Sequence, residues 1–491
     1  LPTTRIASGV ALHDTRMLVD PLRSQSRSVL MGALLLLTGL LGCLVFSFIR
    51  PGGAAGNNPV LADRDTAALY VRVNDELHPA LNLTSARLIA GRPDNPTMVP
   101  SAELDKFPRG SLIGIPGAPE RMVPNTSRDA DWTVCDAATG DVVGVTLIAG
   151  ALTEGGSRAG ALGAHDAVLV RNDGVGSAGV NGGSWLLWNG KRSAVDLNNR
   201  AVTAALGLGA NGTALPAPRP IADGLFNAIP ESAPLAAPVI VNAGQPTPYP
   251  LPVAAPVGSV VTAVSTEAAT DNAIRYYAVL DDGLQPISQV VAAILRNTDS
   301  YGLEQPPRLS ADQVARIPVS TAINTATYPE RPLTVVDATK APLTCARWTK
   351  HDGATTNSLT LLSGATLPLP ADEHTVALAG PAGTAQRVAV TPGTGYFVQA
   401  TGQAGTAALS GYWISDTGVR YGISTEGDAT NDNRKTPAAL GLTASPLPVP
   451  WSILSQFAPG PTLSRSDALQ IPALVPTRTS PAVEIAVREN P

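Results

Sequence analysis

Residues 184–190 read Ser-Trp-Leu-Leu-Trp-Asn-Gly, an apolar and aromatic run that ends at an Asn-Gly pair. Such a run is typical of a β-strand that enters a tight hairpin, because Asn and Gly tolerate the positive φ angles of a two-residue turn. Similar runs end at a turn signal in residues 275–283 and 411–418. We therefore predict three hairpins, with returning strands over 191–195, 284–288 and 419–424.

Further landmarks follow these hairpins along the chain. Ala-Leu-Gly-Leu follows two of the hairpins, at 205–208 and 439–442. Each of the three hairpin units then ends in a segment that closes on a proline, at 227–230, 315–318 and 456–459. A weaker copy opens with Arg87-Leu88-Ile89-Ala90-Gly91 and closes with Ile113-Gly114-Ile115-Pro116. Four units in the same order indicate four small strand-hairpin/helix repeat modules.

The modules are placed symmetrically about two cysteines, Cys135 and Cys345: one module precedes and one follows each of them. This order predicts the architecture. The fold class that we expect is α+β: one N-terminal transmembrane helix, then an elongated pseudo-two-fold ectodomain with a central β-sheet domain built by both halves. Pro-rich residues 234–256 would join the halves as a semi-rigid extended linker. The expected parts are an N-terminal arm (1–28), the membrane helix (29–49), a linker (50–69), module 1 (70–128), the first half of the central domain (129–183), module 2 (184–233), the Pro-rich linker (234–272), module 3 (273–333), the second half of the central domain (334–409), module 4 (410–463) and a C-terminal tail (464–491).

The membrane helix is predicted from Val-Leu-Met-Gly-Ala-Leu-Leu-Leu-Leu-Thr-Gly-Leu-Leu-Gly-Cys-Leu-Val-Phe-Ser-Phe-Ile, the uncharged residues 29–49. As a helix this run spans roughly 30 Å, the thickness of a hydrocarbon core. More arginines precede it than follow it, which places the N-terminus in the cytoplasm and the long C-terminal part outside. Residues 8–25 are either an amphipathic helix on the inner leaflet or against a partner, or a plain linker. The residues expected to dock on membrane or partner are Arg16, Met17, Leu18, Leu22, Arg23 and Arg27.

Three cysteines fit this topology. Cys43 lies in the membrane span, whereas Cys135 and Cys345 fall on the outer side. Two thiols in an oxidising compartment favour one disulfide, which would close a loop of about 210 residues. The alternative is a pair of free buried thiols. A zinc site needs four ligands, and five scattered histidines do not supply them.

Composition and motifs exclude several functions. The 491 residues include 46 Gly and 44 Pro, only 15% are charged, and the net charge of −5 gives no basic surface for nucleic acid. The only Gly-Lys pair, Gly190-Lys191, lacks both the upstream glycine and the following Ser or Thr of a phosphate-binding loop. We therefore expect no catalytic, cofactor or metal site, and we lean against an enzyme.

Aromatic residues of the hairpins leave two interpretations open. They could stack on glycans, or they could pack the hairpin within each module, and their recurrence at equivalent strand positions favours packing. These residues are Trp185, Trp188, Tyr276, Tyr277, Tyr412 and Trp413.

Several phrases resemble a known family. They are Asp-Thr-Arg-Met-Leu at 14–18, Ala-Leu-Tyr-Val-Arg-Val at 68–73, the run 81–91, Gly-Ile-Pro-Gly-Ala-Pro at 114–119 and Trp-Thr-Val-Cys at 132–135. The chain resembles EccB, the single-span membrane component of mycobacterial type VII (ESX) secretion systems, over essentially its whole length. The resemblance implies four modules similar to the cell-wall-binding subunit of a phage lysin, a central six-stranded sheet, and a disulfide between Cys135 and Cys345.

The resemblance also implies a function and partners. We expect a structural subunit of the secretion complex in the inner (plasma) membrane, with its C-terminal ectodomain in the periplasm. The implied partners are the motor ATPase EccC, EccD, EccE, a mycosin protease and other EccB copies in a hexameric complex, with membrane lipid but no nucleic acid. One alternative is a module that binds peptidoglycan. Another is an ATPase, as members of this family are often labelled, although no P-loop is present.

Overall fold

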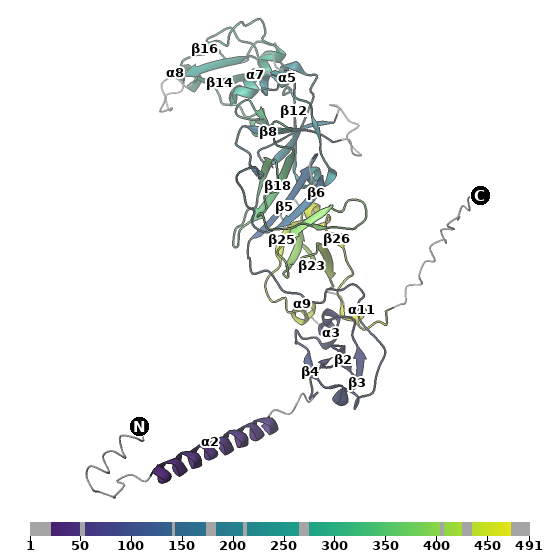
Figure 1. The fold of residues 1–491 in the computed structure, drawn as a ribbon. Helices are drawn as coiled ribbons and strands as arrows, with labels where there is room; N and C mark the ends of the chain where they lie inside the picture. The colour runs from purple at the N-terminus through teal and green to yellow at the C-terminus, as the bar shows by residue number, and fades with distance from the viewer. Residues whose placement is uncertain are drawn as a thin grey trace, which may run out of the picture. The chain divides into compact units, whose positions relative to one another are not determined.

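The computed structural model describes residues 21–49, 55–139, 143–172, 183–209, 214–264, 274–402, 407–424 and 435–472. They divide into two compact units that are described separately here. The first unit contains the residues up to 79 together with 95–111, and the second contains 80–94 together with the residues from 112 onward. The class is mixed α+β with several sheets and one long apolar helix, as the sequence predicts (Figure 1).

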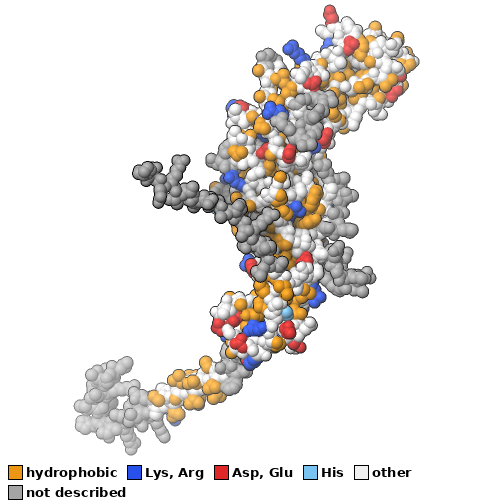
Figure 2. Space-filling view, turned by 90° about the vertical axis from the view of Figure 1, so that its right-hand side faces the viewer, with side chains coloured by type: hydrophobic (Ala, Val, Ile, Leu, Met, Phe, Trp, Pro, Cys, Tyr) orange, Lys and Arg blue, Asp and Glu red, His pale blue; other side chains and the backbone are white. Residues whose placement is uncertain are grey.

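The long apolar helix is α2, Pro21–Ile49, which contains the predicted span. Its stretch Ser26–Val45 has a mean hydropathy of 2.3 and none of it is buried. Apolar side chains cover the helix surface (Figure 2), and Leu35 and Leu36 are 72% and 70% exposed. Exposing so much apolar surface to water is unfavourable, so α2 is a candidate membrane span by length and composition.

The remainder of the first unit is a small sheet with strand order β3-β2-β1-β4, called the first sheet below. Its hairpin turns at Asn74 and Asp75, which both have positive φ (49° and 65°) as a two-residue turn requires. Leu61, Leu77, Val99 and Leu104 fill its core. The strands are β1 (Val60–Asp63), β2 (Leu69–Val73), β3 (Glu76–Pro79) and β4 (Thr97–Val99), with helix α4 at Ser101–Leu104.

Three sheets of the second unit repeat the strand order of the first. In each sheet an antiparallel strand precedes the hairpin and takes a parallel strand on its outer edge. The second sheet is β11-β8-β9-β10-β12, the third is β15-β14-β13-β16 and the fourth is β25-β22-β23-β24-β26. The predicted hairpins are present as β9–β10, β14–β15 and β23–β24.

The bounds of these strands are as follows. The second sheet consists of β8 (Asp166–Arg171), β9 (Ser184–Trp188), β10 (Lys191–Val195), β11 (Arg219–Pro220) and β12 (Glu231–Leu235), and β17 (Thr334–Val335) also pairs with β8. The third consists of β13 (Val260–Val264), β14 (Ile274–Leu280), β15 (Gly283–Ile287) and β16 (Arg308–Leu309). The fourth consists of β22 (Tyr396–Thr401), β23 (Ala407–Ile414), β24 (Val419–Ile423), β25 (Leu447–Pro450) and β26 (Ala458–Pro459).

Short helices follow the hairpins and reuse the same end signals. Asn82, Asn199 and Ser288 cap α3 (Leu83–Ala90), α5 (Arg200–Ala205) and α7 (Gln289–Thr298) by accepting a backbone N–H in the first turn. Gly91, just after α3, has a φ of 68°, and the matching Gly207 and Gly441 also have positive φ. The remaining helices are α6 (Asp223–Ala228), α8 (Ala311–Ala315), α9 (Lys435–Ala439), α10 (Trp451–Leu454) and α11 (Arg465–Ala468), with a 3₁₀ turn at Thr325–Thr327.

Two expectations for the first copy are wrong. The phrase Arg87–Gly91 does not open the first copy, because it forms the end of helix α3 and its left-handed cap, after the β2–β3 hairpin. The closing proline is Pro108 rather than Pro116: its carbonyl accepts from the Leu77 amide at 2.9 Å. Pro230 and Pro318 accept in the same way from the second hairpin strand of their own sheets.

The central sheet joins both halves of the chain in the order β20-β21-β6-β5-β18-β19-β7. It has seven strands among the described residues, where the resemblance implied six. In Figure 1 β5, β6 and β18 lie between strands of the second sheet and strands of the fourth. The strands are β5 (Ala130–Ala137), β6 (Gly144–Ala149), β7 (Gly160–Ala161), β18 (Leu343–Lys350), β19 (Ser358–Gly364), β20 (Val376–Ala377) and β21 (Arg387–Val390).

The two faces of the central sheet have different cover. One face, with Trp132 and Trp348, shares a continuous core with residues of the second and fourth sheets, such as Leu187 and Ile414. The other face carries Cys135 and Cys345 and packs against loop residues such as Leu152 and Leu367. The second and fourth sheets therefore cover the same face.

Glycines at two hairpin tips contact opposite parts of the central sheet. A Cβ at Gly190 would overlap the carbonyl oxygen of Leu359 in β19. A Cβ at Gly418 would lie 2.5 Å from Cγ1 of Val388 in β21. Both glycines have positive φ (70° and 78°), so glycine is required there for the turn and for the close approach.

The Pro-rich stretch 234–256, predicted as an extended linker, packs against the third sheet. The Tyr249 hydroxyl donates to the carbonyls of Leu280 (2.9 Å) and Gly283 (3.1 Å), and Leu251 and Val253 contact the same core. Burial and the neighbouring Asp282 raise the pKa of Tyr249 to about 12, so its hydroxyl donates throughout the physiological range.

Gly190→Ala tests the contact between the hairpin tip and the central sheet. We expect a loss of about 2–4 kcal/mol in the free energy of unfolding, from left-handed backbone strain plus overlap with the Leu359 carbonyl. The matched control is Gly302→Ala, which has a similar φ of 76° but open space around its Cβ. Urea unfolding of both variants measures the difference, and equal losses would show that the contact contributes nothing.

Candidate functional site

The residues expected to dock on membrane or partner are only partly within the described chain. Arg16, Met17 and Leu18 lie outside the described residues. Leu22, Arg23 and Arg27 belong to the first turns of α2. The structure therefore supports a continuous helix from Pro21 into the apolar run, and the docking role of these residues stays a prediction.

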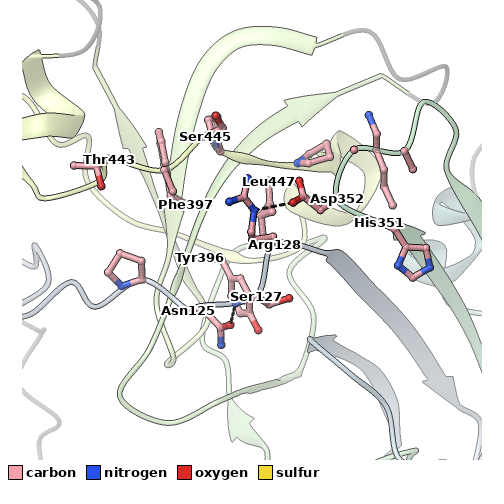
Figure 3. A pocket seen from close by; sticks show the side chains of 17 residues that line it. Asn125, Ser127, Arg128, His351, Asp352, Tyr396, Phe397, Thr443, Ser445 and Leu447 are labelled. Carbon is pink, nitrogen blue, oxygen red and sulfur yellow. Dashed lines mark hydrogen bonds and ion pairs between the residues drawn. The ribbon is translucent and has the colours of Figure 1, made fainter.

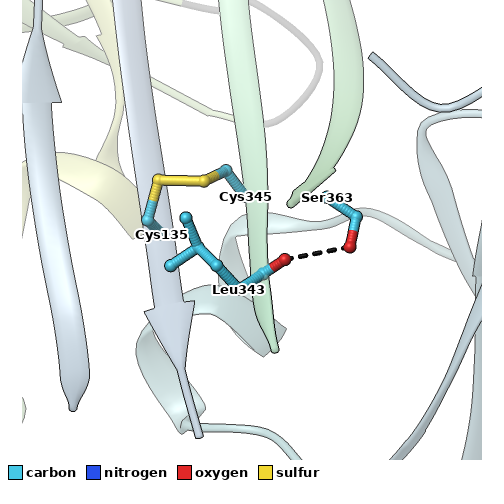
Figure 4. The surroundings of a disulfide bond; sticks show 4 residues. All are labelled: Cys135, Leu343, Cys345 and Ser363. Carbon is cyan, nitrogen blue, oxygen red and sulfur yellow. Dashed lines mark hydrogen bonds between the residues drawn. A yellow bond between two sulfur atoms is a disulfide. The ribbon is translucent and has the colours of Figure 1, made fainter. Parts of the chain in front are cut away.

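A pairing between β5 and β18 forms the middle of the candidate site. The two strands run antiparallel over eight paired positions, from Leu343 opposite Ala137 to Lys350 opposite Ala130. Cys135 and Cys345 lie directly opposite each other in this register and form a disulfide across 210 residues of sequence (Figure 4). Both cysteines are fully buried. The disulfide therefore lies within the core that the two halves of the chain share.

An ion pair also links the same two strands, near the start of β5 and in the second half of β18. Arg347 of β18 donates Nε and Nη2 to the two carboxylate oxygens of Asp131 in β5, at 2.9 and 2.6 Å. The side chain of Asp131 is only 12% exposed, and that of Arg347 is 28% exposed. Glu154 lies 3.7 Å from the same guanidinium. Asp131 and Glu154, together with this bidentate hydrogen bonding, raise the pKa of Arg347 further above its ordinary value.

Two further charged side chains, Asp136 and Arg219, link the central sheet to the second sheet through hydrogen bonds to the backbone. The Asp136 carboxylate accepts from the Ala222 amide at 2.8 Å, and Arg219 donates to the Ala341 carbonyl at 3.0 Å. Burial raises the pKa of Asp136, and burial lowers the pKa of Arg219 to about 10. Both groups satisfy backbone atoms where β11 and α6 meet the central sheet, which is a structural role.

The Gly190-Lys191 pair has no geometry for phosphate. Gly190 turns the β9–β10 hairpin against Leu359, and Lys191 begins β10. The Lys191 ammonium donates to the Ala326 carbonyl at 3.1 Å and lies 4.0 Å from the centre of the Trp188 ring. Its charge is thus engaged by the protein. Within the described residues, no group of His, Cys, Asp and Glu side chains could hold a metal ion.

The hairpin aromatics are mostly engaged in packing. Trp188 and Trp413 are 4% and 1% exposed, so neither presents a face to solvent. Trp185 meets Phe226 edge to face at 5.1 Å, and Tyr412 meets Trp451 at 6.1 Å. Tyr276 and Tyr277 of β14 are half-buried and contact cores on opposite faces of the third sheet. These contacts favour packing over glycan stacking.

One hollow opens beside the β5–β18 pairing, with a volume of about 600 Å³. Figure 3 shows its polar side chains and the ion pair between Arg128 and Asp352 (2.7 Å). Phe397 and Leu447 of the fourth sheet supply apolar wall. The sequence carries no motif for this hollow, because its walls come from four separate segments.

These features define a class: a β-rich protein with one candidate membrane anchor and a disulfide-linked central sheet. The chain belongs to the EccB family, because the family model described as "Type VII secretion system ESX-1, transport TM domain B" matches residues 3–476.

Relatives and solved structures agree with this assignment. A protein of Mycolicibacterium smegmatis (strain ATCC 700084 / mc(2)155), named ESX-3 secretion system ATPase EccB3, is 61% identical over 95% of this chain and 88% of its own length. The solved EccB3 dimer from the ESX-3 core complex is 56% identical, covers 84% of this chain and 100% of that chain, and has a TM-score of 0.74. A chain of an intact ESX-5 inner membrane complex is 35% identical, covers 98% of this chain and 95% of that chain, and also has a TM-score of 0.74.

Removing the disulfide should destabilise the second unit strongly. We expect Cys135→Ala with Cys345→Ala to lower the free energy of unfolding by about 3–5 kcal/mol, because the bond closes a long loop in the unfolded chain. Cys43→Ala is the matched control, since it removes a cysteine without a bond. Thermal unfolding with and without reductant measures the effect; an unchanged midpoint in the double variant would contradict it.

The Arg347–Asp131 pair should couple far more strongly than the exposed Arg128–Asp352 pair. A double-mutant cycle of Arg347→Met and Asp131→Asn should give about 1–3 kcal/mol, because the carboxylate is nearly buried. The same cycle on Arg128 and Asp352, which are 79% and 55% exposed, should give under about 1 kcal/mol. Equal coupling in the two cycles would contradict this ranking.

Proposed function

We propose that this chain is a structural subunit of a type VII secretion complex in the inner membrane. The observation that carries the proposal is the family match over residues 3–476. Two solved structures that match this chain come from an ESX-3 core complex and an ESX-5 inner membrane complex. In the proposed role α2 anchors the chain, and the disulfide-linked sheets provide a stable outer part.

The proposed partners are other copies of this chain and other secretion components. Self-association is supported by the relative that was solved as a dimer. The finer proposal is that the N-terminal arm docks the motor ATPase EccC, and that EccD, EccE and a mycosin protease join a hexameric complex. Residues 21–49 form one helix, which supports a direct connection between the arm and the span.

The proposed topology has the N-terminus in the cytoplasm and the sheets in the periplasm. The arginines that precede the apolar run support this orientation. The buried Cys135–Cys345 bond supports it independently, since disulfides persist mainly in oxidising compartments.

We also propose that the first to fourth sheets are copies of one module that follow a pseudo-two-fold order along the chain, with one copy before and one copy after each of the strands β5 and β18. Their shared strand order and recurring helix caps support this. The likeness to a phage-lysin cell-wall-binding subunit belongs to the same proposal. Peptidoglycan binding through the hairpin aromatics is less well supported, because Trp188 and Trp413 are buried.

Nucleotide hydrolysis is not part of the proposed function. The curated relative carries the word ATPase in its name. In this chain, however, the only Gly-Lys pair lies in a hairpin, and its lysine is held by the Ala326 carbonyl and the Trp188 ring. A phosphate loop needs free backbone N–H groups around the phosphates and a lysine that reaches them.

Deleting residues 1–28 tests the docking role of the arm. We expect the full complex to lose its motor ATPase on native gels. Because the deletion also removes the arginines that support the orientation, formation of the Cys135–Cys345 disulfide is measured alongside, to show that the sheets still reach the oxidising side. The matched control deletes residues 477–491, which lie beyond the family match and should leave assembly intact. Retention of the motor at the level of the unaltered chain would contradict the docking role.

A further inference from the structure

Two hollows lie side by side between the central sheet and the fourth sheet, and they are together called the cleft below. The first has a volume of about 600 Å³ and the second about 390 Å³. Four residues line both hollows: Asn125, Ser127, His351 and Tyr396. The two hollows therefore adjoin, and a ligand of several linked residues that lies along the shared wall would reach both.

Hydrogen bonds hold the walls of the cleft in place. Tyr396, which is 4% exposed, meets Trp132 edge to face at 5.2 Å and donates to the Ala149 carbonyl at 3.3 Å. Trp132 in turn donates to the Pro448 carbonyl at 2.8 Å. The backbone N–H of Asn125 donates to the Gly395 carbonyl at 2.7 Å. A preformed cleft of this kind lowers the entropy cost of binding.

Most charges in the cleft are paired within the protein. Arg347 pairs with Asp131 in the second hollow, and Arg128 pairs with Asp352 in the first. His351 lies 3.4 Å from Asp129. The Arg347–Asp131 and Arg128–Asp352 pairs each combine one positive and one negative charge, so they set no preference for the sign of a ligand.

Two charged side chains have no ion pair among the described residues. Lys350, at the end of β18, lines the first hollow, and Glu373 lines the second. Both are half-buried. Burial and the neighbouring Asp372 raise the pKa of Glu373, and an ammonium group beside its carboxylate would oppose that shift. The first hollow thus has one uncompensated positive side chain and the second has one uncompensated negative side chain.

The wall of the first hollow adds an apolar requirement. Phe397, Pro446 and Leu447 are half-buried and present carbon surface between the polar groups. Figure 3 shows Phe397, Leu447, Arg128 and Asp352 around the same space. A polyanion would meet the Glu373 carboxylate, and a purely apolar ligand would leave both charges without partners.

We propose that this cleft binds a short zwitterionic peptide, with its carboxylate at Lys350, its amine at Glu373 and small aliphatic side chains along Phe397 and Leu447. Thr391 also lines the second hollow, where its hydroxyl would lie near the peptide backbone, whereas the side chains of Asn125 and Ser127 make hydrogen bonds within the protein. The site goes beyond the assembly function and does not depend on it. It would make the outer part of the subunit a receptor for small peptides.

Calorimetric titration of the full detergent-extracted chain tests the proposal, with free-ended alanine peptides from di-alanine to penta-alanine as probes. We expect at least one length to bind, with affinity falling about tenfold when either its amine is acetylated or its carboxylate is amidated. No binding by any length, or equal affinity of capped and free peptides, would overturn the proposal.

Variants assign each end of the peptide. Lys350→Met should lower the affinity for the free peptide about tenfold but leave the affinity for the amidated peptide unchanged. Glu373→Gln should lower the affinity for the free peptide by a similar factor but leave the affinity for the acetylated peptide unchanged. The controls Lys340→Met and Glu330→Gln alter exposed residues that do not line the cleft and should bind as the unaltered chain does. If the two cleft variants also bind as the unaltered chain does, the assignment is wrong. Complex assembly on native gels should be unaffected in all four variants, which separates this site from the assembly function.

Discussion

The antiparallel pairing of β5 with β18 is the constraint on which the second unit depends. Each strand brings one half of the chain, and the register places Trp132 opposite Trp348 and Cys135 opposite Cys345. A shift by one residue would turn the tryptophans to the disulfide face and the cysteines to the opposite face. The covalent bond, the Arg347–Asp131 pair and the shared core all require the same register, so they stabilise it together.

The second and fourth sheets depend on this pairing, whereas the third sheet also has buried cores of its own. The second and fourth sheets complete their cores against the tryptophan-bearing face of the central sheet. The third sheet packs on the second through α7 and α5, where Val290 and Ile294 meet Val202. Sheets that bury part of their apolar surface against neighbours gain part of their stability from those contacts. Gly190 and Gly418 allow close approaches to the central sheet, since a single added carbon would collide there.

Local signals in the sequence predicted the hairpins and the candidate membrane span. They did not predict which distant strands pair with one another. Asn189-Gly190 specifies a turn within two residues, and the uncharged run 29–49 specifies a span by length alone. The strands that precede each hairpin, such as β8 and β22, are short apolar runs without a turn signal, and their parallel partners lie 45 or more residues away in some sheets. The Arg87–Gly91 phrase was expected to open the first copy although Asn82 and Gly91 carry the signals of a helix start and stop. The charged neighbours of the tryptophans, Asp131 and Arg347, were visible in the sequence, but only the fold shows that they meet.

The position of the disulfide in the chain has a mechanical consequence. The second and third sheets lie wholly between Cys135 and Cys345, whereas the first and fourth lie outside that interval. Tension applied between the two ends of the polypeptide would pass through the sulfur–sulfur bond and bypass the enclosed 210-residue interval. The enclosed sheets are thereby shielded from stretching. Under such tension the first and fourth sheets can unfold while the second and third sheets, between the two cysteines, keep their structure.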